Sequence, residues 1–376
     1  MRVHKVRFEG FGGIVGTADP PGLYWVDRPY LQERGYHGGA AWAGPASPGL
    51  SGPVEMEIAV TTRCNLACGC CYTDARPGGG EVPTFRVEAA LEAAAGLGVF
   101  HVAFGGGEPL LHPELLDLAR RARELGLLPS LTTNGTLVDP NWARAAATVF
   151  ARVNVSVDLP GGPRDGRAVN SAWAAVRRLR REGVTAGVNY VVTRRNLDRL
   201  GEVFRLARQA GADSLLVLRP KPGGRGTATY PGLALSLEQA RTLLGRLGRL
   251  AVRHRLHFHL DCALAPLLIS RPVSRPRLVY LGARGCIAGD LLLTVDAAGM
   301  VAPCSHLPPI GRLEDLPGLW QDSPRLAGLR ERLPAGCSGC PNADLCRGGC
   351  AAVAALHGEL PHASDPDLPC TGCRIS

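Results

Sequence analysis

Between residues 54 and about 260, short apolar runs alternate with longer stretches in which apolar residues recur every three or four positions. The short runs are apolar almost throughout, as strands are when both faces of a parallel sheet are buried. They predict strands at residues 55–60, 100–105, 128–133, 152–158, 185–192 and 214–218. The longer stretches predict helices between them, for example at residues 84–96, 114–125, 171–182 and 197–210.

This alternation of strand and helix predicts an α/β fold. Consecutive strand–helix units imply a parallel sheet with right-handed crossovers. A curved sheet of this kind, a partial (β/α)6 barrel, carries its chemistry at the carboxyl ends of the strands. We therefore predict a parallel barrel over residues 54–265, with its active site at that end.

The two ends of the chain follow other patterns. Residues 3–9, 13–16 and 23–26 predict small strands, and a Gly/Pro/Ser-rich linker follows at 38–53. A Pro/Arg-rich connection at 266–276 leads into a region rich in Cys, Gly and Pro. We thus divide the chain into a short β-rich extension, the barrel and a Cys-rich domain, at residues 1–53, 54–265 and 266–376.

Composition is that of a globular protein, with 45% hydrophobic and 20% charged residues. No run of 18 apolar residues exists, and the first ten residues lack the apolar segment of a secretory signal. We therefore expect a cytoplasmic protein without a membrane partner. The formal charge of +9 could favour an acidic partner such as a peptide, a membrane surface or nucleic acid, or it could reflect the Arg-rich helices, which we favour. No basic stripe with interleaved aromatics occurs, so nucleic acid is not an expected partner.

The thirteen cysteines are unevenly placed. Four lie between Cys64 and Cys71 and nine between Cys262 and Cys373, with none in the stretch between these groups. In a reducing compartment, clustering of this kind indicates metal ligation rather than disulfides.

Three cysteines of the first group, Cys64, Cys68 and Cys71, have the spacing C-x3-C-x2-C directly after the first predicted strand. Three thiolates can hold three irons of a [4Fe–4S] cluster and leave the fourth iron open to another ligand. A structural zinc site would require four ligands.

This run resembles the signature of the radical S-adenosylmethionine (SAM) superfamily, in which SAM chelates the fourth iron. One position departs from the pattern, because Cys70 stands where an aromatic residue is common; we interpret Cys70 as a non-ligand. The segment 105–109, Gly-Gly-Gly-Glu-Pro, resembles the family's Gly-Gly-Glu-Pro motif, although a Gly-rich turn after a strand is also frequent. Residues at the ends of the later strands match the positions that line the SAM pocket in this family.

The resemblance implies particular contacts with SAM. Glycines allow a close approach of the backbone to the ligand, and Glu108 is expected to fix the methionyl ammonium. Ser156 and Asp158 are candidates for the ribose hydroxyls, while Asn189 and Arg219 are candidates for the nucleoside or the carboxylate. The full predicted pocket consists of Tyr72, Gly106, Gly107, Glu108, Pro109, Thr133, Asn134, Ser156, Asp158, Asn189 and Arg219.

The C-terminal cysteines resemble the seven-cysteine SPASM domain, which binds two auxiliary [4Fe–4S] clusters. The resemblance assigns Cys286, Cys304 and Cys350 to the first auxiliary cluster. It assigns to the second cluster Cys337, Cys340, Cys346 and Cys370. A zinc ribbon is the alternative, since C-x2-C pairs also bind zinc. For the first cluster, either Cys262 or Cys373 is the fourth ligand or one iron stays open, and we favour the open site.

The resemblance also implies an activity. The first cluster would reduce SAM to methionine and a 5′-deoxyadenosyl radical, which abstracts hydrogen from a C–H bond, and the auxiliary clusters would accept an electron. Asp261 and Asp290 are candidates for a general base. SPASM relatives most often modify peptides, as in the maturation of ribosomal peptides (RiPPs). We expect a peptide substrate with a leader and a reductant such as flavodoxin or ferredoxin.

Other interpretations remain open at this point. The substrate could be a small molecule or a cofactor precursor, or the chain could be an iron–sulfur electron carrier that does not cleave SAM. Residues 8–30 resemble the start of a leader-recognition module, but the segment is short for a complete module, and a capping hairpin is expected.

Overall fold

The computed structural model describes residues 2–19, 21–43, 49–162, 168–271, 273–280 and 282–367. Its main element is a ten-stranded sheet. The strands follow in the spatial order β10 (His257–Leu260), β9 (Ser214–Leu218), β8 (Ala186–Val191), β7 (Arg152–Ser156), β6 (Leu128–Thr133), β5 (His101–Gly106), β4 (Glu55–Thr61), β11 (Leu292–Val295), β12 (Met300–Ala302) and β13 (Gly311–Arg312).

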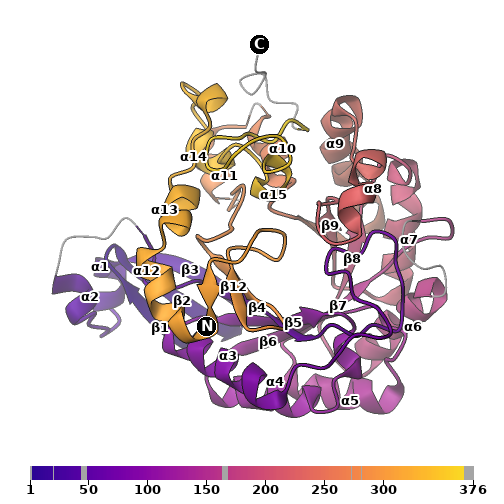
Figure 1. The fold of residues 1–376 in the computed structure, drawn as a ribbon, viewed down its shortest axis with the longest axis horizontal. Helices are drawn as coiled ribbons and strands as arrows, with labels where there is room; N and C mark the ends of the chain where they lie inside the picture. Colours follow the sequence, from indigo (N-terminus) through magenta and orange to yellow (C-terminus); the bar gives the residue numbers. More distant parts are fainter. Residues whose placement is uncertain are drawn as a thin grey trace.

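All neighbouring pairs from β10 to β11 are parallel, and only β12 and β13 run antiparallel. The predicted α/β barrel core is therefore confirmed, and each predicted strand forms as one of β4 to β9. Helices cover the outer side of the curved sheet (Figure 1). They are α3 (Thr84–Gly96), α4 (Leu115–Glu124), α5 (Pro140–Val149), α6 (Val169–Arg181), α7 (Leu200–Ala210) and α9 (Leu237–His254). Helix α8 (Gly226–Leu233) packs towards the Cys-rich region instead, since Tyr230 shares an apolar cluster with Cys350.

Four strands of the sheet, β10 to β13, lie outside the predicted set. Strand β10 alternates exposed and half-buried positions at the sheet edge, so it lacks the apolar run that identifies the inner strands. Strand β11 comes from the Cys-rich region and pairs with β4, more than 200 residues earlier in the chain. A pairing between such distant segments leaves no local signal in the sequence.

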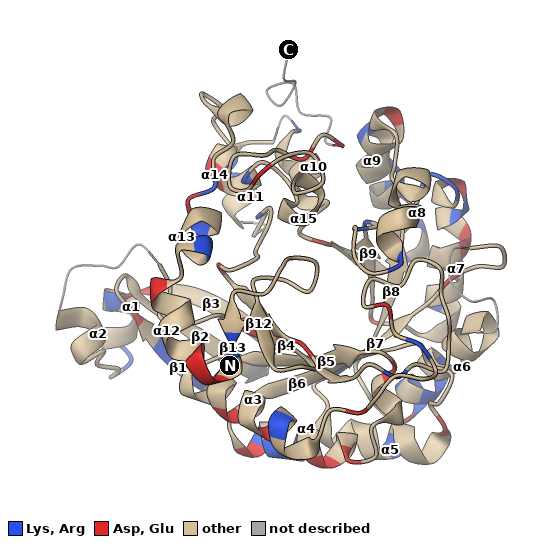
Figure 2. Cartoon of the chain, viewed as in Figure 1, with Lys and Arg blue, Asp and Glu red and all other residues tan. Residues whose placement is uncertain are grey.

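The chain after β10 also forms short helices, before β11 and after β13, and several of them lie together across the open side of the curved sheet (Figure 1). They are α10 (Ala265–Ile269), α11 (Arg275–Tyr280), α12 (Leu316–Asp322), α13 (Pro324–Arg330), α14 (Ala343–Cys346) and α15 (Ala351–Ala354). Acidic and basic residues alternate over the outer helices of the barrel, without a single-signed stripe in this view (Figure 2). Among the described residues, no helix is both long and apolar enough to cross a membrane.

The N-terminal segment is larger than the expected hairpin. It forms a three-stranded antiparallel sheet, β1 (Arg2–Glu9), β2 (Gly12–Asp19) and β3 (Pro21–Asp27), followed by α1 (Arg28–Gln32) and α2 (Ala40–Ala43). The apolar side chains of this small sheet pack against the barrel, since Ile14 lies in one apolar cluster with Val54 and Phe100. Arg7 fastens it further by donating to the carbonyl oxygens of Pro53 (2.6 Å) and Gly52 (2.8 Å). Packing on the barrel removes the need for an independent core.

Candidate active site

The loop that follows β4 carries Cys64, Cys68 and Cys71. It is held in a compact shape by its own backbone, with the Cys71 N–H donating to the carbonyl of Cys68 at 3.2 Å. The Leu66 N–H points at the sulfur of Cys64 at 3.4 Å. All three thiols are free of disulfides and partly accessible. Three sulfur donors on one loop fit the ligand set of an iron–sulfur cluster with an open iron.

The end of β5 lies against the start of this loop. The N–H of Gly107 donates to the carbonyl of Thr61 (2.7 Å), and that of Glu108 donates to Arg63 (2.9 Å). A Cβ atom at Gly107 would lie 2.0 Å from the carbonyl oxygen of Arg63. At Gly106, which has a φ of +112°, it would lie 2.3 Å from the oxygen of Thr61. Both positions therefore require glycine, and the reason is contact with the cysteine loop.

Glu108 is buried, with 1% of its surface exposed, and turns towards the end of β6. Its carboxylate accepts a hydrogen bond from the Thr133 hydroxyl (2.6 Å) and another from the Asn134 N–H (2.7 Å). Burial raises the pKa of Glu108 to about 7, although these hydrogen bonds favour the charged form. The ends of β5 and β6 thus form one unit around a carboxylate that titrates near neutral pH.

Asn134 connects this unit to the cysteine loop. Its side-chain amide donates to the Asn65 side chain at 2.9 Å and lies 3.9 Å from the sulfur of Cys64. Asn65 in turn donates to the Thr136 hydroxyl at 2.7 Å. The predicted pocket residues Glu108, Thr133 and Asn134 therefore lie in one hydrogen-bonded group beside the predicted cluster ligand Cys64.

Ser156, Asp158 and Asn189 lie at the next two strand ends. Ser156 of β7 is paired in register with Asn189 of β8, and all three side chains are buried. The side-chain oxygen of Asn189 is buried and has no hydrogen-bond partner within the described part of the chain. Buried polar atoms in native proteins normally have a partner, so a ligand atom at this place would satisfy Asn189. These residues fit a polar ligand such as a nucleoside.

The loop between β9 and α8 reaches across to the cysteine loop. Arg225 donates to the carbonyl oxygens of Cys68 and Ala75, both at 3.0 Å, and forms an ion pair with Asp74 at 2.6 Å. The N–H of Gly226 donates to the carbonyl of Cys71 at 3.2 Å. This contact was not predicted from the sequence, although the Gly-rich run at 223–226, shortly after the end of β9, is a usable signal.

Two predicted pocket residues face the Cys-rich region instead. The ring of Tyr72 lies against that of His306, with centroids 4.8 Å apart. The guanidinium of Arg219 forms two hydrogen bonds with Asp365, at 2.5 and 2.9 Å, and one with Asp367 at 2.8 Å. These contacts occupy most donors of Arg219 and fasten the C-terminal segment to the end of β9.

The two candidate general bases have different surroundings. Asp261, at the end of β10, forms an ion pair with Lys221 at 2.7 Å. Burial by itself raises the pKa of Asp261, but the charge of Lys221 together with hydrogen bonds from Lys221 and Ala263 lowers the net pKa. Asp290 accepts from Arg347 at 2.9 Å and is also paired with Arg284. Asp290 is thus held by two guanidinium groups, while Asp261 lies at the carboxyl end of the parallel strands.

Lys221 and Glu57 were not among the predicted site residues. Burial lowers the pKa of Lys221, but the carboxylate of Asp261 and neighbouring thiols hold it well above its usual value. Glu57 lies on β4 near Lys221, and burial raises its pKa. Two glutamates, Glu55 and Glu57, at alternate positions of a largely apolar strand are the sequence signal for charged groups inside the barrel.

The C-terminal cysteines are spread over several segments of the Cys-rich region. Cys286, Cys337, Cys346 and Cys350 are buried, and Cys304 and Cys340 are partly accessible. Cys370 and Cys373 lie outside the described residues. No three described His, Cys, Asp or Glu side chains are arranged to hold one metal ion.

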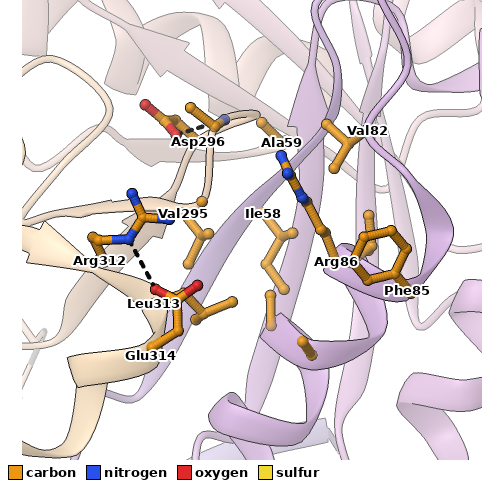
Figure 3. A pocket seen from close by; sticks show the side chains of 15 residues that line it. Ile58, Ala59, Val82, Phe85, Arg86, Val295, Asp296, Arg312, Leu313 and Glu314 are labelled. Atoms are coloured by element: carbon orange, nitrogen blue, oxygen red, sulfur yellow. Dashed lines mark hydrogen bonds and ion pairs between the residues drawn. The ribbon is translucent and has the colours of Figure 1, made fainter.

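A separate cavity of about 280 Å³ lies between the start of α3 and the β11–β13 segment (Figure 3). Phe85 and Arg86 line it from α3, and Asp296 and the ion-paired Arg312 and Glu314 line it from the other side. None of the predicted site residues lines this cavity.

Comparison with known proteins adds independent information. Residues 58–207 match the family model described as Radical SAM superfamily. A mycofactocin maturase, MftC, of Mycobacterium tuberculosis is 31% identical over 339 residues, covering 85% of this chain and 83% of that protein. An AdoMet-dependent heme synthase of Methanosarcina barkeri is 26% identical, covering 80% of this chain and 92% of that protein. A PqqA peptide cyclase of Gluconobacter oxydans is 29% identical, covering 80% and 86% respectively.

A solved structure has the same fold over nearly the whole chain. It is Streptococcus suis SuiB bound to the precursor peptide SuiA, with a TM-score of 0.73, 18% sequence identity and coverage of 98% of both chains. The coverage includes the N-terminal sheet and the Cys-rich region as well as the barrel.

Proposed function

This chain belongs to the radical SAM superfamily, and we propose that it is a radical SAM/SPASM enzyme that oxidatively modifies a peptide, as in RiPP maturation. The observation that carries the proposal is the hydrogen-bonded group at the carboxyl ends of β4, β5 and β6. There, the thiol of Cys64, the amide of Asn134 and the carboxylate of Glu108 are neighbours. An electron carrier without SAM chemistry would need no such pocket beside its cluster.

Membership of the family implies SAM and one [4Fe–4S] cluster as cofactors. Cys64, Cys68 and Cys71 would hold this cluster, which supplies an electron for reductive cleavage of SAM and thereby a radical that abstracts hydrogen. Glu108 would accept a hydrogen bond from the amino group of SAM, and Ser156, Asp158 and Asn189 would face the nucleoside. The other predicted pocket residues keep their proposed roles, except that Tyr72 lies against His306 of the Cys-rich region. Arg219 orders the C-terminal segment.

Two auxiliary [4Fe–4S] clusters in the Cys-rich region complete the proposal. Cys286, Cys304 and Cys350 would bind the first, and the ligands of the second would be Cys337, Cys340, Cys346 and Cys370. The division at residues 53 and 265 belongs to the same proposal, with the qualification that β11 of the third segment pairs with β4 of the second. A reductant such as flavodoxin or ferredoxin would supply the electron for the first cluster.

The peptide substrate is supported by the relatives, since one is a PqqA peptide cyclase and the SuiB structure contains a precursor peptide. Strand β3 provides a place for a leader. It pairs only with β2 in the described part of the chain, and Tyr24 and Trp25 on it are 40% and 49% exposed. An extended leader would add as a fourth strand along this edge.

Asp261 is our candidate for the general base on the substrate. It lies at the same end of the barrel as the SAM pocket, and Lys221 keeps its carboxylate charged. Asp290 is the weaker candidate because two arginines already neutralise it.

A small-molecule substrate is the second candidate function, because one relative is an AdoMet-dependent heme synthase. The N-terminal sheet distinguishes the two candidates. A peptide-modifying enzyme should lose substrate affinity when β3 is altered by Tyr24→Ala/Trp25→Ala. An enzyme for a small molecule should not respond to this change.

The first experiment is a comparison of three proteins purified and reconstituted without oxygen. They are the parent, Cys64→Ala/Cys68→Ala/Cys71→Ala and the single variant Cys70→Ser. We expect about twelve irons in the parent, about eight in the triple variant, and 5′-deoxyadenosine from the parent and Cys70→Ser alone. Iron binding without SAM cleavage by the reduced parent would contradict the proposal and favour an electron carrier.

A further inference from the structure

The segments that carry Cys286, Cys304 and Cys350 meet in one part of the Cys-rich region. Cys286 and Cys304 pack in a small apolar cluster that includes Leu307. Cys350 belongs to an adjoining cluster, which Leu307 also contacts. The proposed ligands of the first auxiliary cluster are therefore neighbours, although 64 residues separate the first from the last.

The segment at the end of β10 reaches the same part of the Cys-rich region from the barrel. Ala263, the residue after Cys262, packs in the apolar cluster of Cys350. Its carbonyl accepts a hydrogen bond from Arg219 at 3.5 Å, and Arg219 is bound to Asp365. Asp365 in turn accepts from the Cys350 N–H at 3.0 Å. A short chain of contacts thus ties the backbone beside Cys262 to the backbone of Cys350.

The residue before Cys262 is tied to the same group. Asp261 forms an ion pair with Lys221 at 2.7 Å and accepts a hydrogen bond from the Ala263 N–H at 3.1 Å. The residues on both sides of Cys262 are therefore fixed, and Ala263 holds this segment against the apolar cluster that contains Cys350.

We propose that Cys262 is the fourth protein ligand of the first auxiliary cluster, together with Cys286, Cys304 and Cys350. This assignment rests on the proposed function and replaces the open iron that the sequence favoured. Binding of iron would release the thiol proton of Cys262. Lys221 would then offset the negative charge of four thiolates in a buried place.

The assignment has a consequence for the substrate. With four protein ligands, the cluster has no iron to which a peptide thiolate or amide could bind. Its function is then limited to electron transfer, and substrate must be positioned by other groups at the barrel mouth. Asp261 directly precedes Cys262 in the chain. It would therefore place a general base for the substrate next to the cluster that accepts the electron.

The test uses the full chain with Cys64→Ala/Cys68→Ala/Cys71→Ala, so that only auxiliary clusters contribute spectra. To this protein we would add Cys262→Ala in one sample and Cys373→Ala in a matched control. Iron is counted and the EPR spectrum of the reduced clusters is recorded with and without cyanide, which binds open iron. We expect a cyanide-dependent signal, or about one iron fewer per chain, only when Cys262 is replaced.

Several outcomes would overturn the assignment. A cyanide effect in the protein that retains Cys262 would demonstrate an open iron, and an effect confined to Cys373→Ala would make Cys373 the ligand. If Cys262→Ala fails to fold, Cys262→Ser replaces sulfur by oxygen, and an unchanged EPR spectrum in that variant would also refute the proposal. SAM cleavage by the parent tests the proposed function separately. A parent that cleaves SAM but carries only about four irons would remove the auxiliary clusters and this ligand with them.

Discussion

The two groups of cysteines are built in opposite ways. Cys64, Cys68 and Cys71 lie on one loop. Backbone hydrogen bonds hold this loop together and connect its start to the end of β5. The C-terminal group is brought together from distant segments that meet only in the folded chain. Local spacing therefore defines the first site, while tertiary contacts define the second.

The two regions also differ in how charge is used. The first is held mainly by hydrogen bonds between uncharged groups, around the single carboxylate of Glu108. The second is crossed by buried ion pairs, such as those of Arg219 with Asp365 and of Lys221 with Asp261. A buried pair is costly to break because the remaining partner keeps an uncompensated charge. We expect the second region to be the more sensitive to removal of a single charge.

The largest effect is expected from Arg219→Met. This change leaves Asp365 buried without its partner and should lower the free energy of unfolding by about 3–5 kcal/mol. Arg275→Met is the matched control, since Arg275 forms a similar pair with Asp344 at the surface. Such exposed pairs contribute about 0–1 kcal/mol. Anaerobic urea unfolding measures both, and equal losses would remove the distinction between the two regions.

Much of the first region could be predicted from the sequence. Strands β4 to β9 have apolar runs, and the Cys64–Cys68–Cys71 spacing is local, so pattern and spacing were sufficient. The sequence did not predict β11 or the contact of Arg225, because both depend on segments that are distant in the chain. It also assigned Arg219 to the SAM pocket, since a residue after a strand end does not reveal which partner it meets. Asp365 became visible as that partner only in the structure.

The next prediction concerns Glu108 and the pH dependence of the free energy of unfolding. Its pKa of about 7 in the fold, against an ordinary value of 4.5, means that the folded state retains a proton that the unfolded state has released. Stability from this group is therefore present below about pH 4.5 and is lost as the pH rises to about 7, with a limit of about 3 kcal/mol. Unfolding of the SAM-free protein at pH 5 and pH 8 measures this loss.

Glu108→Gln should flatten that part of the pH dependence, whereas Glu92→Gln, at an exposed position on α3, should leave it unchanged. The same titration governs ligand binding, since the ionised carboxylate is the form that attracts the amino group of SAM. Affinity for SAM should therefore rise with pH through about 7 in the parent and not in Glu108→Gln. Parallel curves for the two proteins would exclude Glu108 from the pocket.

The run of three glycines before Glu108 allows a purely steric test of the first region. Gly107→Ala would place a Cβ atom 2.0 Å from the carbonyl oxygen of Arg63 and displace the cysteine loop. A displacement of about 1 Å can reduce a rate about a hundredfold, and we expect a loss of this size in SAM cleavage. Gly105→Ala is the control, because no described atom beyond its chain neighbours lies within 4 Å of the added Cβ. Similar rates for the two variants would show that the close approach is not required.

The smallest effect is expected from Arg225, whose contact links the cysteine loop to a segment that is distant in the chain. Arg225 comes from the β9–α8 loop, yet it binds the backbone of the cysteine loop at Cys68 and Ala75 as well as Asp74. Arg225→Met should loosen the loop by about 1.4 kcal/mol, which corresponds to about tenfold faster release of iron to a chelator. Arg76→Met is the control, since Arg76 binds the same Asp74 but lies on the loop itself and is exposed. If the two variants release iron equally fast, the first site is stabilised by its own loop alone. If only Arg225→Met is faster, then even the locally defined site depends on a contact from the far side of the barrel.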